Sequence, residues 1–425
     1  MAEANTVSLQ VHSVSSTFHE PTWLQEIREQ AWQQFDTMPE PRLEKTDLRK
    51  RGWETGTFAA ASAKPAAEAS EYVTGVSHPI ALFADGHLVE LKVPLELAQQ
   101  GVIFTDIHSA AEKHADLFKK HFATVVTKAE SKWSALNLAL FAGGIFLYVP
   151  RGLQLEVPFE VVHAISADAA GSYPRSLIVA DELADVKVIE TSFVASGRQK
   201  VTNSHVIEVV AKQGSRVSVA TADELGKGPT YFLTRRAELH KDAQVEWLVS
   251  DVSDGFAVEL VESVLKGAGA QSQTRVIGLG YGREHIDLTA SMVHEGRNTE
   301  SEIIMHNVLC DRANSIYRSR TEIVKGAVEA GSEQSDRMIM VDGTARADAI
   351  PMLLIDENDV KRCGHAASVG KIDPNQIYYL MSRGIPKAEA TKMIIWGYLH
   401  ESVEALPSES VRQLVTGRIE RELGR

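Results

Sequence analysis

Short apolar runs dominate the chain from Gly143 onward. They are rich in β-branched residues, are separated by polar turns, and continue for roughly two hundred residues. Repeated short strands joined by turns, with no helices between them, favour a β-solenoid. A large β-sandwich or jelly roll remains the alternative, although the Asp-Gly hairpin signals that it needs are few. Equivalent positions in five runs follow at steps of 31, 28, 27 and 29 residues, namely Val186, Val217, Val245, Ser272 and Ser301.

Helical patterns precede and follow this region. Residues 20–36 carry an apolar stripe at helical spacing after Pro21, and residues 106–122 and 132–141 predict further helices. After Gly370 the chain predicts three short helices, the first of them capped by Asp373. We therefore expect a helical and mixed N-terminal region at 1–140, a β core at 141–368, and a C-terminal helical domain at 369–425.

Composition narrows the classes of function. The 425-residue chain has a formal net charge of −13, which disfavours nonspecific attraction to nucleic acid or anionic lipid. No uninterrupted apolar run approaches the roughly 18 residues of a membrane span, and the first residues do not have the pattern of an export signal. Two cysteines in so long a chain fit a reducing compartment. We expect a cytoplasmic protein without a nucleic-acid or membrane partner.

The densest candidate chemistry is the tripeptide Cys363-Gly-His365. Thiolate and imidazole both suit iron, zinc and copper(I), although a lone cysteine or histidine is more often a packing or surface residue. In a strand, residues i and i+2 point to the same side, so the two side chains face one site together. The other cysteine, Cys310, follows His306 at a spacing of roughly 13 Å in a strand, too far for that pair to hold one ion. The pattern therefore predicts a half-site whose remaining ligands come from another chain.

Nucleotide-binding motifs are absent from the sequence. Neither Gly226-Lys227 nor Gly370-Lys371 has the upstream glycine and the following hydroxyl residue of a phosphate-binding loop. The stretch 278–282 lacks the spacing of a dinucleotide fingerprint and predicts a turn or bulge. We do not expect the chain itself to hydrolyse ATP.

The C-terminal block resembles a known family. Residues 358–373, Asn-Asp-Val-Lys-Arg-Cys-Gly-His-Ala-Ala-Ser-Val-Gly-Lys-Ile-Asp, followed by Gln-Ile-Tyr-Tyr-Leu-Met-Ser-Arg-Gly-Ile at 376–385, are similar to the signature of the SufB/SufD family of iron-sulfur cluster assembly proteins. The shortage of cysteines and the pattern around Trp23 favour the SufD branch. This resemblance implies a right-handed parallel β-helix core between helical regions. It also implies a scaffold and not an enzyme, which pairs with SufB through the end of the β-helix and binds the ATPase SufC through its C-terminal helices.

The resemblance also assigns roles to residues. It places His365 at the SufB interface and Cys363 beside it, at a transient iron-sulfur cluster shared with SufB. ATP enters only through SufC, and a reduced flavin is an expected electron source that no motif locates. The exposed strand edges of a β-helix favour a homodimer when the chain is isolated. The partner-binding residues expected on the C-terminal helices are Ile377, Tyr378, Leu380, Arg383, Gly384, Ile385, Met393, Ile394 and Tyr398.

Two alternatives stay open at this point. One is a purely structural subunit of the same complex that never contacts metal. The other is a β-helix enzyme that acts on polysaccharide, a class that is usually exported and therefore fits the N-terminus poorly.

Overall fold

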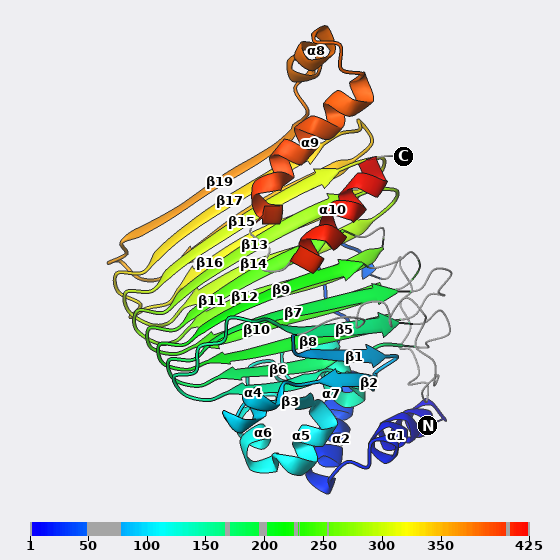
Figure 1. Cartoon of the computed structure of the whole chain (residues 1–425), viewed down its shortest axis with the longest axis vertical. Helices are drawn as coiled ribbons and strands as arrows, with labels where there is room; N and C mark the ends of the chain where they lie inside the picture. The colour runs from blue at the N-terminus through cyan, green and yellow to red at the C-terminus, as the bar shows by residue number, and fades with distance from the viewer. Residues whose placement is uncertain are drawn as a thin grey trace.

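The structure is a computed structural model, and it describes residues 2–48, 78–165, 171–194, 202–224, 228, 230–252, 255–404 and 409–423. Helices lie at its two ends and a long stack of strands lies between them (Figure 1). The N-terminal helices are α1 (Ala2–Thr17), α2 (Thr22–Thr37), α4 (Leu95–Gln99), α5 (Ile107–Lys113), α6 (Ala115–His121) and α7 (Lys132–Leu140). The C-terminal helices are α8 (Pro374–Ser382), α9 (Lys387–Glu404) and α10 (Glu409–Leu423).

The strands form two long sheets. The ten-stranded sheet has the order β19-β17-β15-β13-β11-β9-β7-β5-β1-β2, and the nine-stranded sheet has the order β18-β16-β14-β12-β10-β8-β6-β4-β3. The bounds in the first sheet are β1 (Ile80–Ala84), β2 (His87–Lys92), β5 (Phe159–Ile165), β7 (Asp185–Val194), β9 (Arg216–Glu224), β11 (Gln244–Asp251), β13 (Gln271–Gly280), β15 (Glu300–Leu309), β17 (Gly331–Met340) and β19 (Arg362–Lys371). Those in the second are β3 (Ile103–Asp106), β4 (Ile145–Val149), β6 (Arg175–Ala180), β8 (Thr202–Ala211), β10 (Thr230–Leu239), β12 (Phe256–Leu265), β14 (His285–His294), β16 (Asn314–Ile323) and β18 (Arg346–Ile355).

Consecutive strands from β4 onward alternate between the two sheets, and each pairs in parallel with the strand two positions away in the chain. The antiparallel pairs are β1 with β2 and β3 with β4, both at the N-terminal end. This alternation defines a parallel β-helix of about 7 turns, in which each turn adds one strand to each sheet. The predicted solenoid is therefore confirmed, and the sandwich alternative is wrong.

The five repeat positions identified in the sequence occupy one column of the ten-stranded sheet. Val186 pairs with Val217, which pairs with Val245, and the same register continues through Ser272 and Ser301. Two more turns extend the column to Ser332 and then to Cys363. The column faces the interior of the β-helix, where its valines join the main hydrophobic core. It changes from valine to serine to cysteine toward the C-terminal end.

Helices cover the outside of the β-helix at two places. Apolar residues of α2 and α7 pack with Phe146, Leu177 and Val179 of β4 and β6, and so close the N-terminal end. Helices α9 and α10 lie on the outer face of the ten-stranded sheet, where Leu399 and Val415 join the outward apolar residues of β7 to β15. At the other end, β18 and β19 are the edge strands of their sheets (Figure 1). Most residues of β19 are exposed, whereas β5, β6 and β8 are buried throughout.

Local structure departs from the sequence-based expectation in three places. The helix expected over 106–122 is two helices, α5 and α6, because the backbone breaks at His114 (φ −128°, ψ 33°). Helix α1 was not predicted. Gly278 and Gly280 lie inside β13 and not in a turn. A Cβ atom at Gly278 would lie 2.2 Å from the Tyr317 hydroxyl, so this glycine makes room for a side chain of the opposite sheet.

Candidate functional site

Cys363 and His365 lie on β19, the last strand of the β-helix. Cys363 is in register with Ser332 and His365 with Gln334, so both occupy columns that face the interior in the preceding turns. Because no further turn covers them, Cys363 is half-buried and His365 is exposed. The structure thus brings the two predicted side chains to the same side of one edge strand.

A polar network lies directly behind this pair. The Ser301 hydroxyl donates to the Ser332 Oγ (2.9 Å), which also contacts the Thr321 hydroxyl (2.9 Å) of the opposite sheet. The amide of Gln334 donates to the same Thr321 oxygen at 2.7 Å. These side chains span the interior from one sheet to the other. In the column of Val186, Val217 and Val245, the last turns therefore enclose hydrogen-bonding groups where the earlier turns enclose valine.

Asp336, two residues beyond Gln334 on β17, adds a carboxylate to this interior. Its Oδ2 accepts a hydrogen bond of 2.6 Å from Ser319, while Oδ1 is buried without a partner among the described residues. Burial raises the pKa of Asp336 to about 6, against the lowering effects of the Ser319 hydrogen bond and of His365. The Asp336 carboxylate thus interacts electrostatically with the His365 imidazole at the open end.

The electrostatics at Cys363 favour the protonated thiol. Burial raises its pKa, and the carboxylate of Glu333 on the neighbouring strand raises it further. A metal ion bound to this sulfur must therefore displace a proton. The second cysteine, Cys310, is half-buried in the apolar cluster beneath α9, and His306 contacts the Ser402 hydroxyl of α9 at 3.2 Å. Neither Cys310 nor His306 lies on β19 with Cys363 and His365.

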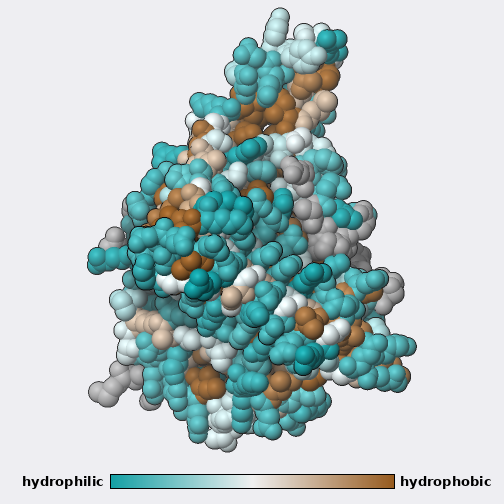
Figure 2. Space-filling view, turned by 90° about the vertical axis from the view of Figure 1, so that its left-hand side faces the viewer, coloured by the Kyte–Doolittle hydropathy of each residue, from teal (hydrophilic) through white to brown (hydrophobic). Residues whose placement is uncertain are grey.

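The nine residues predicted to bind a partner divide into two sets. Tyr378, Arg383, Gly384 and Met393 are exposed, with Tyr378 at 73%. The other five are half-buried, and Ile377, Ile394 and Tyr398 pack against the cluster beneath α9 and α10. Helix α8 has no buried residue and projects from the end of the β-helix (Figure 1). Figure 2 shows apolar residues gathered at this upper end of the molecule.

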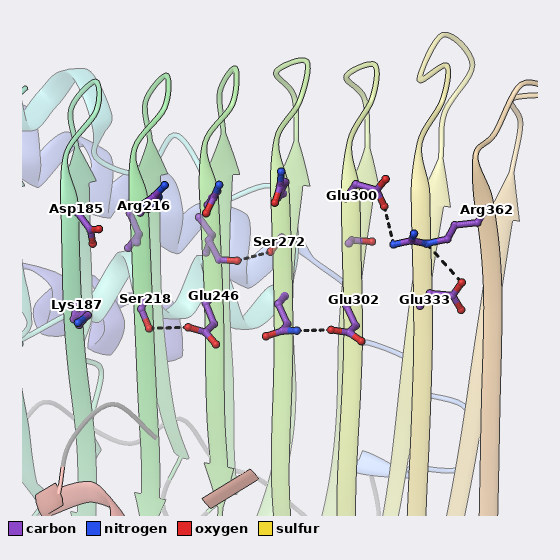
Figure 3. A pocket seen from close by; sticks show the side chains of 16 residues that line it. Asp185, Lys187, Arg216, Ser218, Glu246, Ser272, Glu300, Glu302, Glu333 and Arg362 are labelled. Atoms are coloured by element: carbon purple, nitrogen blue, oxygen red, sulfur yellow. Dashed lines mark hydrogen bonds and ion pairs between the residues drawn. The ribbon is translucent and has the colours of Figure 1, made fainter. Parts of the chain in front are cut away.

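A groove on the outer face of the ten-stranded sheet crosses the strands from β7 to β19 (Figure 3). Its lining is basic at Lys187 and Arg216 and acidic from β11 to β17, and Arg362 of β19 links Glu300 (3.0 Å) to Glu333 (3.7 Å). Ser218 donates to Glu246 at 3.3 Å farther along the groove. Of the charged groups that line the groove, Arg362, Glu300 and Glu333 form surface ion pairs, which contribute little to stability because water and salt screen them.

One buried cluster was missed in the sequence. His163 of β5, Glu190 of β7 and His205 of β8 converge inside the β-helix, with their ligand atoms within 4.8 Å of one another. Their separations in the chain match no local metal motif, because the coil and not the local backbone brings them together. The available signal was the position of Glu190, a charged residue that continues the inward side of β7 after Val186 and Val188.

No helix in the described ranges combines the length and the apolar character that a membrane span requires. Comparison with known proteins gives two matches to family descriptions. Residues 12–161 match the SufBD protein N-terminal region, and residues 163–398 match the SufBD core domain of SUF-system FeS cluster assembly.

Two relatives span nearly the whole chain. The iron-sulfur cluster assembly protein SufD of Bacillus subtilis is 34% identical over 424 residues, which cover 97% of this chain and 96% of that protein. The iron-sulfur cluster assembly protein SufB of the same organism is 28% identical over 439 residues, with 97% and 93% covered.

Proposed function

The chain belongs to the SufB/SufD family of SUF-system iron-sulfur cluster assembly proteins, and from this premise we propose that it is the SufD-like scaffold subunit of a cluster-building complex. In this proposal it pairs with a SufB-like protein through the open end of the β-helix and with a SufC-like ATPase through its C-terminal helices. It acts in the cytoplasm, is not itself an enzyme, and meets ATP only through SufC. The complete complex builds nascent iron-sulfur clusters and passes them to carrier proteins.

The observation that carries this proposal is the position of His365 and Cys363 on an uncovered edge strand. Edge strands of long parallel sheets present unpaired backbone N–H and C=O groups, which natural proteins normally cover. A partner that pairs with β19 brings its own side chains beside the thiol and the imidazole. The shared site then holds the transient cluster, as substrate, between two chains, with His365 as the principal donor and Cys363 assisting.

The C-terminal helices supply the docking surface for SufC in this proposal. Helix α8 presents Tyr378, Tyr379 and Met381 to solvent at 73%, 56% and 45% exposure, and Met393 of α9 adds to them. Exposed apolar side chains gathered in one place are typical of interaction sites. The last residue of β19 is Lys371 and the N-cap of α8 is Asp373, so motion of α8 is passed directly to the edge strand. SufC dimerisation on ATP would in this way open the shared interface.

The first experiment tests the half-site against the purely structural alternative. The complex is reconstituted with SufB and SufC, and bound iron and acid-labile sulfide are measured for wild type, His365→Ala, Cys363→Ala and His400→Ala. His400 is an exposed histidine on α9 and serves as the matched control. We expect His365→Ala to assemble normally but to lose most of the cluster, and Cys363→Ala to lose less. A normal cluster yield from His365→Ala would leave only the structural role.

The second experiment tests SufC docking by substitution on the exposed helix surface. Truncation at Asp373 is unsuitable, because it would uncover the apolar sheet face beneath α9 and α10. We expect Tyr378→Ala combined with Met393→Ala to weaken SufC binding, measured by calorimetry. Leu95→Ala is the control, since Leu95 is equally exposed (67%) but lies on α4 in the N-terminal region. Unchanged SufC binding in the double variant would overturn this part of the proposal.

The proposal has two further elements. A homodimer of the isolated chain uses the same open edges, and a reduced flavin supplies electrons within the complex. The polysaccharide-active alternative has lost its basis, because the family matches cover most of the chain and describe cluster assembly.

A further inference from the structure

The buried cluster of His163, Glu190 and His205 lies inside the first three turns of the β-helix. One carboxylate oxygen of Glu190, Oε1, is 2.7 Å from the His163 Nε2 and 2.8 Å from the His205 Nε2. The Ser176 hydroxyl of β6 donates to the same oxygen at 2.9 Å. The side chains of the three residues are exposed by only 4%, 0% and 7%. The Phe83 ring stacks on His163 with centroids 5.3 Å apart, which fixes the imidazole plane.

The charge of this cluster is not balanced by a permanent cation. Among the described residues, the ion pairs of Glu190 are those with the two histidines. A buried carboxylate without a fixed positive partner is costly in a protein interior.

Glu208 of β8 shows how this fold satisfies a buried carboxylate that is purely structural. Its oxygens accept from the Arg175 guanidinium (2.6 Å) and from the backbone N–H groups of Val125 (3.1 Å) and Val126 (2.9 Å). In Glu190, by contrast, Oε2 is fully buried and has no hydrogen-bond partner among the described residues. The Oε2 oxygen of Glu190 therefore accepts no hydrogen bond from the described residues. A buried polar atom without a hydrogen bond is rare in native interiors and calls for a specific partner.

We propose that His163, Glu190 and His205 bind one divalent transition-metal ion of the Fe(II) or Zn(II) class inside the β-helix. Two imidazoles and one carboxylate are donors that suit both ions and leave a coordination position open. Bonds of about 2.0–2.2 Å to a tetrahedral ion require donor atoms about 3.3 Å apart. The carboxylate therefore moves back by roughly half an ångström or turns its unused Oε2 to the ion, and the two imidazoles, whose ligand atoms lie within 4.8 Å of each other, turn toward the same ion. Ser176 stands ready to hydrogen-bond the carboxylate or a water in the open position.

This site is separate from the half-site on β19. Six strand spacings of about 4.8 Å lie between β7 and β19, which places the two sites about 29 Å apart. The metal is held by one chain alone, whereas the β19 pair needs a partner. The inference therefore does not depend on the proposed function, and each can fail without the other.

The test uses the full-length protein, stripped of metal with a chelator and titrated without oxygen with Co(II), Fe(II) and Zn(II) in separate arms. Co(II) reports a four-coordinate site by its visible absorption, and retained metal is counted by mass spectrometry after desalting. We expect one equivalent of metal and a rise in the midpoint of thermal unfolding, because the ion binds only the folded state. Displacement of bound Co(II) by Fe(II) or by Zn(II) identifies the preferred ion.

Variants locate the ion. Glu190→Gln keeps the shape and one acceptor oxygen but removes the charge, and His205→Asn removes one imidazole ligand. We expect each to weaken metal binding roughly 100-fold or more, since changes to supporting groups alone reach 10–100-fold. His294→Asn is the matched control, because His294 is equally buried but is bonded to Thr299 and Ser301 (2.8 Å each). His365→Ala separates this site from the half-site, and it should retain the metal.

Two results would overturn the proposal. Wild-type protein that binds no more Co(II), Fe(II) or Zn(II) than Glu190→Gln would show that the cluster is a hydrogen-bonded network only. Loss of the bound equivalent in His365→Ala, with retention in both Glu190→Gln and His205→Asn, would place the ion at the open end instead. If the substituted proteins fail to fold, the wild-type titration and its effect on thermal unfolding still decide the question.

Discussion

The first and last turns of the β-helix have the same parallel pairing but opposite surroundings. At the N-terminal end, β5, β6 and β8 are buried along their whole length beneath helices or neighbouring strands. At the C-terminal end, β19 is mostly exposed and β18 is only half-buried. The parallel pairing of the strands alone therefore does not decide where the β-helix ends. Helices cover one end, and the edge strand at the other end is left uncovered.

The two ends also differ in what their charged groups do. Arg175 at the closed end is fully buried in a set of hydrogen bonds that joins two strands to α7 and to the loop before it. Arg362 at the open end is half exposed and pairs with Glu300 and Glu333 on the surface. The same residue type thus stabilises the interior at one end and borders a solvated groove at the other. Substitutions at matched positions test this contrast.

The largest effect is expected at the closed end, for Arg175→Ala. Removing the guanidinium leaves the Glu208 carboxylate buried with only backbone partners, and the loss of one member of a buried pair costs about 3–5 kcal/mol of unfolding free energy. Urea unfolding followed by circular dichroism measures the loss. The double variant Arg175→Ala with Glu208→Gln should recover part of it. A loss below about 1 kcal/mol would mean that the closed end is not held by this pair.

The second prediction concerns Asp336, whose carboxylate is buried near the open end. Its pKa is about 6 in the folded protein against 3.8 for the ordinary side chain, so the folded state binds the extra proton between these values. Stability of the wild type therefore falls as pH rises from about 4 to 6, by roughly 3 kcal/mol at most. Asp336→Asn should be more stable than wild type at pH 7, and the difference should vanish near pH 4.

Urea unfolding at several pH values checks this prediction. Asp356→Asn is the control, because Asp356 is an exposed carboxylate just after β18, and it should show no such pH-dependent gain. If Asp336→Asn were less stable at pH 7, the charged carboxylate would be making a favourable contact, with His365 the nearest candidate.

The third prediction tests whether the open end associates. Val369 of β19 is 42% exposed and forms part of the uncovered end. Val369→Glu places a charge where a partner would bury it, and should weaken pairing roughly tenfold or more without changing stability. Sedimentation velocity of the isolated chain and of its mixture with SufB measures the effect. Val157→Glu, at a 53% exposed position just before β5, should leave pairing unchanged.

The smallest effect is expected for Arg362→Ala. Its side chain is 51% exposed, and pairs of this kind contribute about 0–1 kcal/mol because water and salt screen them (Figure 3). The same urea titration used for Arg175→Ala measures the change, so the two arginines are compared directly. A loss close to that of Arg175→Ala would remove the distinction between the closed and the open end.

The repeat was the part of the fold that the sequence predicted best. Val186, Val217, Val245, Ser272 and Ser301 were placed at equivalent positions, and they share one interior column. The prediction succeeded because each turn must place a side chain of suitable size at the same depth. It stopped short of Ser332 and Cys363, the last members of that column, because the change from valine to polar residues hid the period.

The closed-end helices and the buried cluster were harder to predict. The break at His114 has no proline or glycine to mark it, so a single helix from 106 to 122 was expected. His163, Glu190 and His205 come together only through the register of β5, β7 and β8, which no spacing in the sequence fixes. Cys363 and His365 were found because both lie on one strand, where two residues of separation are enough to define a common side.

The ten-residue edge strand β19 has a consequence for how the protein must be produced. Its unpaired backbone groups are a template that accepts any suitable strand, including the same strand of another copy. Copies in which β19 is uncovered would associate with one another through this edge and would no longer be available for function. Something must therefore cover β19 soon after the chain folds, because an uncovered edge strand invites association between copies.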